Sequence, residues 1–452
     1  MRAAAARERW YLTDVMRRKI LLVSQVYAPD PAAVARLMAD VGVELARRGH
    51  EVVVLTADRG YDNPDVKYAS SVTDEGVEIR RLPFSSFGKG SMLLRVLGGL
   101  SFSLQAGFRS LVMPRLHTIV VTTSPPMGSL SAVIVGALRR IRVVYWPMDL
   151  NPDQVVALGL ATERSLSVRM FEWLNRAILR RADTVIALDR AMAGRLERKQ
   201  PVADKLVIVP PWPEDDEVEA VPHEENPFRR QHGLEGKTVV MYSGTLGPSN
   251  PVRTILDAAK RLEDDLRLVF LFIGGGTGMA EVRALNRPNI RCLPYEPLSR
   301  MRFSLSAGDV QLVSLGDDMA GIVHPCKVYG AMAIGKPILF VGPSNSHVSE
   351  LMSEREFGWE VRHGDVEHAV RVLREIADAE RCTLAEMGRQ AQRQIAANRT
   401  RRISRGQVCD AIEGSSGRTT VSGSSADAVA LETERARRAD RAPIASSRLA
   451  EP

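Results

Sequence analysis

The stretch KILLVSQVYAPDPAAVARLMADVGVELARRGHEVVVLTA, residues 19–57, decides the fold class. It contains an apolar run, a loop with prolines, a segment with apolar positions at helical spacing, and RRGHEV leading into a second apolar run. A strand, a helix and a strand in this order are typical of a parallel sheet with crossover helices. Because the strands are apolar almost throughout, we expect both faces of the sheet to be covered.

The same alternation continues along the chain in two series. Apolar runs of the first series begin at Lys19, Glu51, Thr118, Arg142, Thr184 and Lys205, and those of the second at Val239, Leu268, Ile290, Asp309, Pro337 and Trp359. Residues 210–228 between them are rich in proline and acidic residues, which is typical of an interdomain linker. The sequence therefore predicts an α/β fold of two doubly wound, Rossmann-like domains facing a cleft, with ligands outside the carboxyl ends of the strands.

These patterns divide the chain into six segments. We expect a disordered leader at 1–17, an N-terminal Rossmann-like domain at 18–209, a linker at 210–237, a C-terminal Rossmann-like domain at 238–398, a return helix at 399–414 and a disordered tail at 415–452. The leader carries charge where a secretory signal has an apolar core, and Met16 is an alternative start. The tail lacks the apolar content needed to order itself.

Composition excludes several classes of protein. The 452 residues are 45% hydrophobic and 25% charged, which argues against a collagen, a coiled coil or a wholly disordered chain. A net charge of +7 permits attraction to membranes, nucleic acid or phosphorylated small molecules without choosing among them. The four cysteines form no CxxC pair and the histidines no HxH or HExxH spacing, so we predict a reduced, cytoplasmic protein without protein-bound metal.

The most specific segment is GIVHPCKVYGAMAIGKPILFVGP, residues 321–343. Its pattern predicts a loop, a helix that Lys327 opens, and a strand after Gly335-Lys336-Pro337. A loop that feeds a helix N-terminus offers backbone N–H groups to an anion, and Lys327 adds a positive charge. This segment predicts a diphosphate site; the alternative is an ordinary strand–loop–helix joint with a solvated lysine.

A matching loop, YSGTLGPSNP at residues 242–251, follows the first strand of the second series. Gly244 and Gly247 would let a ligand approach the backbone closely. Gly274-Gly275-Gly276 is interpreted as turn chemistry, because neither a GxGxxG fingerprint nor a Walker motif is present. Hydride transfer and P-loop ATPase chemistry are therefore disfavoured.

Two further segments lie in the first series. Asp149, in YWPMDLNPDQVVALG (145–159), follows a strand end, where it is either an N-cap or a group facing the cleft, and it is the better catalytic candidate. Residues 91–117 form an amphipathic stretch with Arg95, Arg109 and Arg115. Such a stretch is able to lie in a membrane interface, and the alternative is a core-facing helix pair with basic surface residues.

Together these segments resemble the GT-B glycosyltransferases of family four, in the branch of bacterial exopolysaccharide and O-antigen transferases of the colanic-acid type. The resemblance covers about residues 19–396 and is carried by VYAPDPAAVARLMADVGVELARRGHEV, DLNPDQVVALG, YSGTLGPSNPVRTILDAAKRL and GIVHPCKVYGAMAIGKP. It implies a C-terminal domain that binds a nucleotide sugar and an N-terminal domain that binds the acceptor. It also implies retention of anomeric configuration without a bound metal or other cofactor.

Carried over by position, the resemblance implies a catalytic pair of Asp149 and Lys327. The implied donor-binding residues are Gly244, Thr245, Arg253, Leu293, Tyr295, Gly321, Ile322, Val323, His324 and Lys327. Two glutamates common in the family are replaced by Ile322 and Gly330, and a facing Arg and Lys by Thr245 and Asn250. Phosphate neutralisation then rests on Lys327, helix N-termini, and Arg253 or His324, and the ribose-binding residue is unidentified.

The expected function is that of a retaining hexosyltransferase, which moves a sugar from a nucleoside diphosphate to a lipid-linked or glycan acceptor. We expect it to work at the inner face of the cell membrane, and we do not expect it to bind nucleic acid. One alternative is a catalytically silent GT-B module in a polysaccharide-assembly complex. The other is a GT-B nucleotide-sugar epimerase. The sequence does not name the sugar, the base, the acceptor, the linkage or the oligomeric state.

Overall fold

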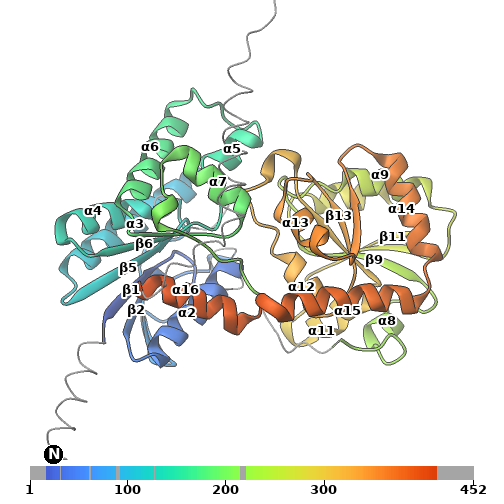
Figure 1. Ribbon diagram of the computed structural model, residues 1–452, viewed down its shortest axis with the longest axis horizontal. Coiled ribbons are helices and arrows are strands. Elements are labelled where there is room, and N and C mark those ends of the chain that lie inside the picture. Colours follow the sequence, from blue (N-terminus) through green and yellow to red (C-terminus); the bar gives the residue numbers. More distant parts are fainter. Residues whose placement is uncertain are drawn as a thin grey trace, which may run out of the picture.

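The computed structural model describes residues 17–30, 32–60, 63–87, 92–126, 128–213 and 220–414, which form two α/β domains (Figure 1). Residues 1–16 of the expected leader and the expected tail, 415–452, lie outside the described residues. So do residues 214–219 of the expected linker.

The described strands of the N-terminal domain form an eight-stranded sheet in the order β3-β4-β2-β1-β5-β6-β7-β8. Neighbours pair in parallel, except in the antiparallel hairpin of β3 and β4. The sequence pattern does not predict this hairpin, because β3 is exposed along its whole length and lacks apolar alternation. The strands are β1 (Lys19–Val23), β2 (Glu51–Ala57), β3 (Ser71–Asp74), β4 (Val77–Leu82), β5 (Leu116–Thr122), β6 (Arg142–Trp146), β7 (Thr184–Ala187) and β8 (Leu206–Ile208).

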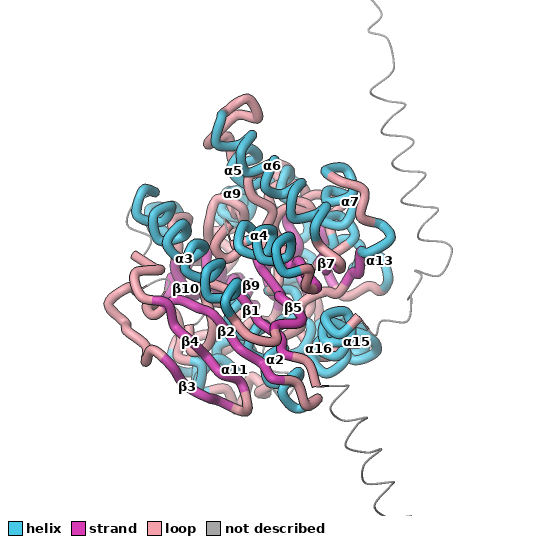
Figure 2. Tube along the Cα trace, turned by 90° about the vertical axis from the view of Figure 1, so that its left-hand side faces the viewer, coloured by secondary structure: helices cyan, strands magenta, loops and turns pink. Residues whose placement is uncertain are grey.

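Helices cover both faces of this sheet (Figures 1 and 2). One face carries α2 (Ala33–Arg47) and α16 (Arg401–Glu413); the other carries α3 (Met92–Val112), α4 (Ser129–Arg139) and α6 (Leu166–Arg181). The short helices α5 (Asp153–Ala157) and α7 (Arg190–Lys199) and the turn η1 (Ala203–Lys205) complete the domain. In α2, the buried residues Leu37, Met38, Val41 and Leu45 recur at helical spacing, so one stripe faces the sheet.

The C-terminal domain has a parallel sheet in the order β11-β10-β9-β12-β13-β14. Its strands are β9 (Thr238–Thr245), β10 (Leu268–Gly275), β11 (Ile290–Leu293), β12 (Val310–Ser314), β13 (Ile338–Val341) and β14 (Gly358–Val361). Its helices are α8 (Pro227–Gln231), α9 (Arg253–Arg261), α10 (Met279–Leu285), α11 (Met301–Ala307), α12 (Lys327–Ala333), α13 (His347–Glu354), α14 (Val366–Asp378) and α15 (Arg381–Asn398), with turns η2 (Leu298–Arg300) and η3 (Asp317–Met319).

Alternate residues of β9 enter different cores, as the period of a strand requires. Val240 and Tyr242 pack with residues of α9 and α14, whereas Val239 and Met241 pack with residues of α8 and α11. Both faces of the sheet are therefore covered. Parallel sheets with helices on both faces, in two domains, confirm the predicted α/β fold class.

The two domains share apolar packing and a returning helix. One continuous cluster of buried residues joins strands of the N-terminal sheet to residues of α12 and α13. The segment expected as a return helix contains α16, where Arg401 forms an ion pair with Asp40 of α2. Across the same contact, Arg48 lies 2.6 Å from Asp410 and 2.9 Å from Glu413. The two domains are thus connected by the shared apolar cluster and by α16 as well as by the linker.

Candidate functional site

Lys327, the first residue of α12, lies against the loop at the end of β9. Its Nζ donates to the carbonyl oxygen of Thr245 at 3.3 Å and lies 5.1 Å from the ring centroid of Tyr242. Gly244 leaves the space that the Lys327 side chain occupies, because a Cβ on Gly244 would lie 2.7 Å from Cε of Lys327. Gly244 also has φ +118°. Only glycine combines that backbone conformation with that space. Burial lowers the pKa of Lys327.

Tyr295 also contacts the loop at the end of β9, through Thr245. Its hydroxyl lies 2.7 Å from Oγ1 of Thr245, while the residue remains 57% exposed. A Cβ on Gly275 would lie 2.8 Å from the Tyr295 ring, and one on Gly274 would lie 2.2 Å from the carbonyl oxygen of Gly244. The structure thus brings Gly244, Thr245, Tyr295 and Lys327 together.

The triple glycine and Tyr242 belong to the same arrangement, although the sequence analysis assigned neither a role there. The glycines let β10 approach the β9 loop closely. The Tyr242 hydroxyl donates to the carbonyl oxygen of Thr245 at 2.7 Å. Burial raises the pKa of Tyr242, which keeps the hydroxyl protonated as a donor. The run of three glycines was the sequence signal that could have indicated this close approach of β10 to the β9 loop. No sequence pattern identifies Tyr242 as part of the site.

The segment 321–326 lies against the N-terminal domain. Gly321 has φ +71°, and a Cβ there would lie 2.5 Å from the backbone carbon of Ala191. Leu150 donates its N–H to the carbonyl oxygen of Ile322 at 2.9 Å, and Asp149 forms an antiparallel bridge with Val323. The predicted phosphate loop is therefore also a contact between the domains.

The backbone of this segment corrects one expectation. The N–H groups of Ile322 and Val323 donate to Met319, and that of Cys326 donates to His324. Because these three N–H groups already have partners, they are not available to an anion, which removes part of the expected cradle of backbone donors. The positive charge of Lys327 is what the segment offers to an anion.

Asp149 follows β6, where the sequence placed it. The hydroxyl oxygen of Thr123 accepts the N–H of Met148 at 3.0 Å and that of Asp149 at 3.3 Å, which holds the turn. The carboxyl group is partly buried, and burial raises its pKa from 3.8 to about 6. A carboxyl with a pKa near neutrality is suited to hold or release a proton, or to stabilise positive charge when ionised.

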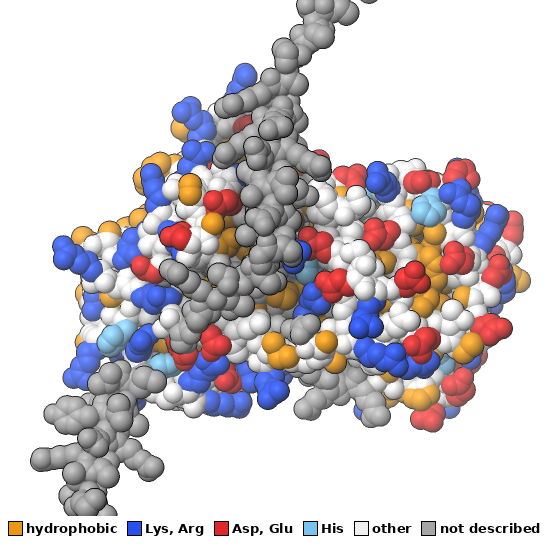
Figure 3. Space-filling model, viewed as in Figure 1, with side chains coloured by type: hydrophobic (Ala, Val, Ile, Leu, Met, Phe, Trp, Pro, Cys, Tyr) orange, Lys and Arg blue, Asp and Glu red, His pale blue; other side chains and the backbone are white. Residues whose placement is uncertain are grey.

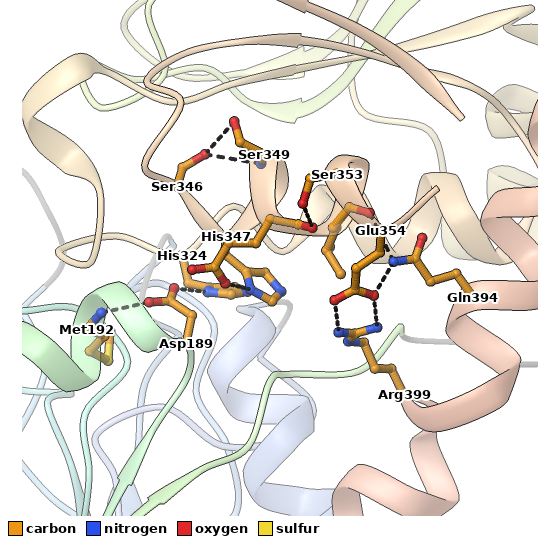
Figure 4. A network of polar contacts seen from close by, with 12 residues as sticks. Asp189, Met192, His324, Ser346, His347, Ser349, Ser353, Glu354, Gln394 and Arg399 are labelled. Carbon is orange, nitrogen blue, oxygen red and sulfur yellow. Dashed lines mark hydrogen bonds and ion pairs between the residues drawn. The ribbon is translucent and has the colours of Figure 1, made fainter. Parts of the chain in front are cut away.

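His324 does not lie where a donor phosphate would need it. In Figure 4 its ring points toward Asp189, the N-cap of α7, and Nδ1 lies 2.6 Å from Oδ2 of that carboxylate. Nε2 lies 2.7 Å from the hydroxyl of Tyr329, which lies 2.9 Å from Nε2 of His347. Burial by itself would raise the pKa of Asp189, but the hydrogen bond and charge interaction with His324, the charge interaction with His347 and the hydrogen bond from the N–H of Met192 together lower it. His324 therefore joins the two domains, and its expected role in phosphate neutralisation is corrected.

Three other expected donor residues lie apart from the Lys327 contacts. Arg253 forms ion pairs with Asp257 at 3.0 Å and Glu281 at 3.1 Å, and lines a cavity of about 310 Å³ whose lining residues do not include Lys327. Ile322 is 2% exposed, and Leu293 packs beside the apolar cluster next to α8 and α11. The side chains of these three residues are therefore engaged away from Lys327.

Known proteins similar to this chain are glycosyltransferases. A family model described as Glycosyl transferase 4-like domain matches residues 32–212. The probable glycosyltransferase WbjE of Pseudomonas aeruginosa is 29% identical over 328 residues, which are 72% of this chain and 82% of that protein. WcaI of Escherichia coli (strain K12), named for colanic acid biosynthesis, is 25% identical over 354 residues, covering 74% and 85%. By these matches the chain resembles the glycosyltransferases of family four.

The fold of this chain is also found among solved structures. HepE of Anabaena, crystallised with UDP and glucose, has a TM-score of 0.64 and 15% sequence identity, covering 87% of this chain and 99% of that one. The resemblance and the GT-B fold that the sequence indicated are both confirmed. At the domain interface, the Asp149 backbone pairs with Val323, four residues before Lys327, which opens α12 and contacts Thr245.

Proposed function

We propose that this glycosyltransferase transfers a hexose from a nucleoside diphosphate to a lipid-linked or glycan acceptor in cell-surface polysaccharide synthesis. The proposed location is the cytoplasm, at the inner face of the cell membrane. The observation that carries this assignment is the position of Lys327, whose Nζ reaches across Gly244 to Thr245. The names of WbjE and WcaI, and the UDP and glucose bound to HepE, support the choice of reaction class.

Lys327 would stabilise the leaving group. When the bond between the sugar C1 and the diphosphate oxygen breaks, negative charge grows on the diphosphate, and a nearby ammonium lowers the energy of that state. Tyr295, exposed beside Thr245, is the aromatic side chain available to the base at the rim of the same arrangement. No metal takes part in the proposed reaction.

Asp149 would act on the acceptor side. In the proposed retaining, front-face displacement, the acceptor oxygen forms the new bond to C1 on the face that the diphosphate leaves, and the hydroxyl proton passes to the departing phosphate oxygen. The Asp149 carboxylate would orient the hydroxyl or stabilise the oxocarbenium-like transition state. Contacts between the domains, such as Gln154 Nε2 to Ser249 Oγ at 3.1 Å, would help to exclude water during transfer.

Nucleotide titration tests the donor site. UDP, GDP, ADP and dTDP are titrated calorimetrically into the purified full chain, and Lys327→Ala is compared with Lys260→Ala, an exposed lysine of α9. We expect micromolar binding of one nucleotide, weakened at least tenfold, about 1.4 kcal/mol, by Lys327→Ala only. Equal binding by both variants and wild type would remove Lys327 from the donor site. NMR of the anomeric proton of the product then tests retention.

The silent module remains the second candidate because of one observation. The positions at which the family commonly carries two glutamates hold Ile322, which is buried, and Gly330, where a Cβ would meet nothing within 4 Å. Donor binding without turnover across an acceptor panel would favour the silent module. Conversion of the donor sugar with no acceptor present would instead favour an epimerase.

A further inference from the structure

A cavity of about 670 Å³ lies at the margin of the N-terminal sheet, where β3 and β4 run beside α3 (Figure 2). Its lining contains one carboxyl group and four cations, which are Asp58, Lys67, Arg80, Arg81 and Arg109. A tyrosine and two serines add hydroxyl groups to this lining. None of these residues belongs to the contacts around Lys327, so the cavity is a separate feature of the N-terminal domain.

Two buried polar atoms of the lining residues have no hydrogen-bond partner within the described chain. They are Nε of Arg81 and Oδ1 of Asp58, in residues that are 6% and 9% exposed. The Arg81 guanidinium is held in place, because it donates to the carbonyl oxygen of Ala28 at 3.1 Å and lies 4.7 Å from the ring centroid of Tyr68. Buried polar atoms normally have partners. An open donor and an open acceptor in one lining therefore indicate a ligand that offers both.

Positive charge predominates in the cavity. Arg80 is paired with Glu78 at 2.7 Å, but the structure gives Lys67, Arg81 and Arg109 no such partner among the residues it describes. Burial lowers the pKa of Arg81, so nearby groups do not fully offset the loss of water around its guanidinium. In contrast, Figure 3 shows acidic and basic side chains interspersed where Figure 1 places the C-terminal domain. The lining thus favours an anionic ligand.

Arg109 belongs to α3, the helix of the amphipathic stretch at residues 91–117. Gln105, one turn before it, donates from Nε2 to the carbonyl oxygen of Pro83 at 2.7 Å, which holds α3 against the end of β4. Arg109 is exposed and lines the cavity, so this part of α3 contributes a cation to it. In the part of the chain that the structure describes, no helix has the length and apolarity needed to cross a bilayer.

The cavity lies at the same edge of the sheet as Asp149. Asp58 directly follows β2 and Pro83 directly follows β4, while Asp149 follows β6, which runs in the same direction. In the sheet order, β2 lies three strands from β6 and β4 lies four strands from it. Neighbouring strands are about 4.8 Å apart, so roughly 14 to 19 Å along this edge separates the cavity from Asp149. A ligand that reaches both places is longer than one sugar ring.

We propose that this cavity binds an acidic sugar, one that carries a carboxylate, within a glycan acceptor. The sugar carboxylate would meet Lys67 and Arg109, and its hydroxyl groups would donate to Asp58 and accept from Arg81. Inorganic phosphate is disfavoured, because its negative charge would lie beside the Asp58 carboxylate without a hydroxyl group to donate to it. The acidic sugar would lie more than one unit from the reacting hydroxyl; its place in the acceptor rests on the proposed function.

NMR titration of the full chain with uronic acid trimers tests the cavity. The probes are trigalacturonic and trimannuronic acid, and the methyl esters of both trimers provide the same rings without charge. We expect the wild type to bind one acid at least tenfold more tightly than its ester. Lys67→Gln/Arg109→Gln should remove this preference and leave the affinity for the ester unchanged, because both side chains are exposed. Lys260→Gln/Arg371→Gln removes two exposed cations of the C-terminal domain and should bind like wild type.

Two results would overturn the proposal. One is equal or absent binding of acids and esters by the wild-type chain. The other is binding of inorganic phosphate as tight as that of the preferred acid and equally sensitive to Lys67→Gln/Arg109→Gln, which would assign the cavity to a simple anion.

Nucleotide titration of the same double variant separates this proposal from the proposed function. The variant should bind the nucleotide like wild type, because its two substitutions lie outside the Lys327 contacts. Uronic acid binding without nucleotide binding by the wild type would leave the cavity assignment standing and remove the donor site. Nucleotide binding without a preference for the acids would do the reverse.

Discussion

Asp149→Asn is predicted to stabilise the protein while it removes transfer activity. Burial raises the pKa of the Asp149 carboxyl from 3.8 to about 6, so the folded state disfavours the charged form relative to the unfolded state. The carboxyl costs nothing below pH 3.8, where it is protonated in both states. The cost grows as pH rises and is complete above about 6, where it reaches at most about 3 kcal/mol. An amide of the same shape carries no such cost.

Urea denaturation of both proteins between pH 5 and pH 7.5 measures this difference. At pH 7.5 we expect the variant to be more stable by at most about 3 kcal/mol, and at pH 5 by roughly half of that, since the wild-type carboxyl is then mostly protonated when folded. Transfer activity of the wild type should rise through a midpoint near pH 6, and that of the variant should be lost. Nucleotide affinity should change less than about threefold, because Asp149 is assigned to the acceptor side.

Asp264→Asn is the matched control, because Asp264 is exposed and its substitution should change stability by less than about 0.5 kcal/mol at either pH. A variant of Asp149 that is less stable than wild type at pH 7.5 would refute the reasoning. So would a stability difference that does not depend on pH.

Two further substitutions test the contacts at the domain interface. Gly244→Ala should displace Lys327 and weaken nucleotide binding at least tenfold in calorimetry. Gly233→Ala is the control and should leave binding unchanged, because Gly233 also has a positive φ but an added Cβ there would have nothing within 4 Å. Equal effects of the two substitutions would indicate general backbone strain. His324→Ala should lower stability by about 3 kcal/mol, because it leaves the Asp189 carboxylate buried without its partner, and denaturation measures this. Its nucleotide affinity should change less than about threefold, and a tenfold loss would return His324 to the phosphate site.

Local patterns in the sequence determined the fold class and the main candidates. Apolar periodicity depends on the geometry of a single strand or helix, so the two alternating series were visible without any tertiary contact. The positions of Gly244 and Asp149 at strand ends and of Lys327 at the start of a helix followed from the same patterns. The β3–β4 hairpin did not, because an exposed strand such as β3 has no apolar alternation.

Contacts between distant residues were decided only by the tertiary structure. Lys327 reaches Thr245 across 82 positions, and His324 meets Asp189 across 135, distances over which no periodic pattern carries information. The pKa of Asp149 depends on the atoms that bury it, which its place in the sequence does not reveal. Sequence thus determines which elements form, because their geometry is local; packing determines which side chains meet and which remain exposed.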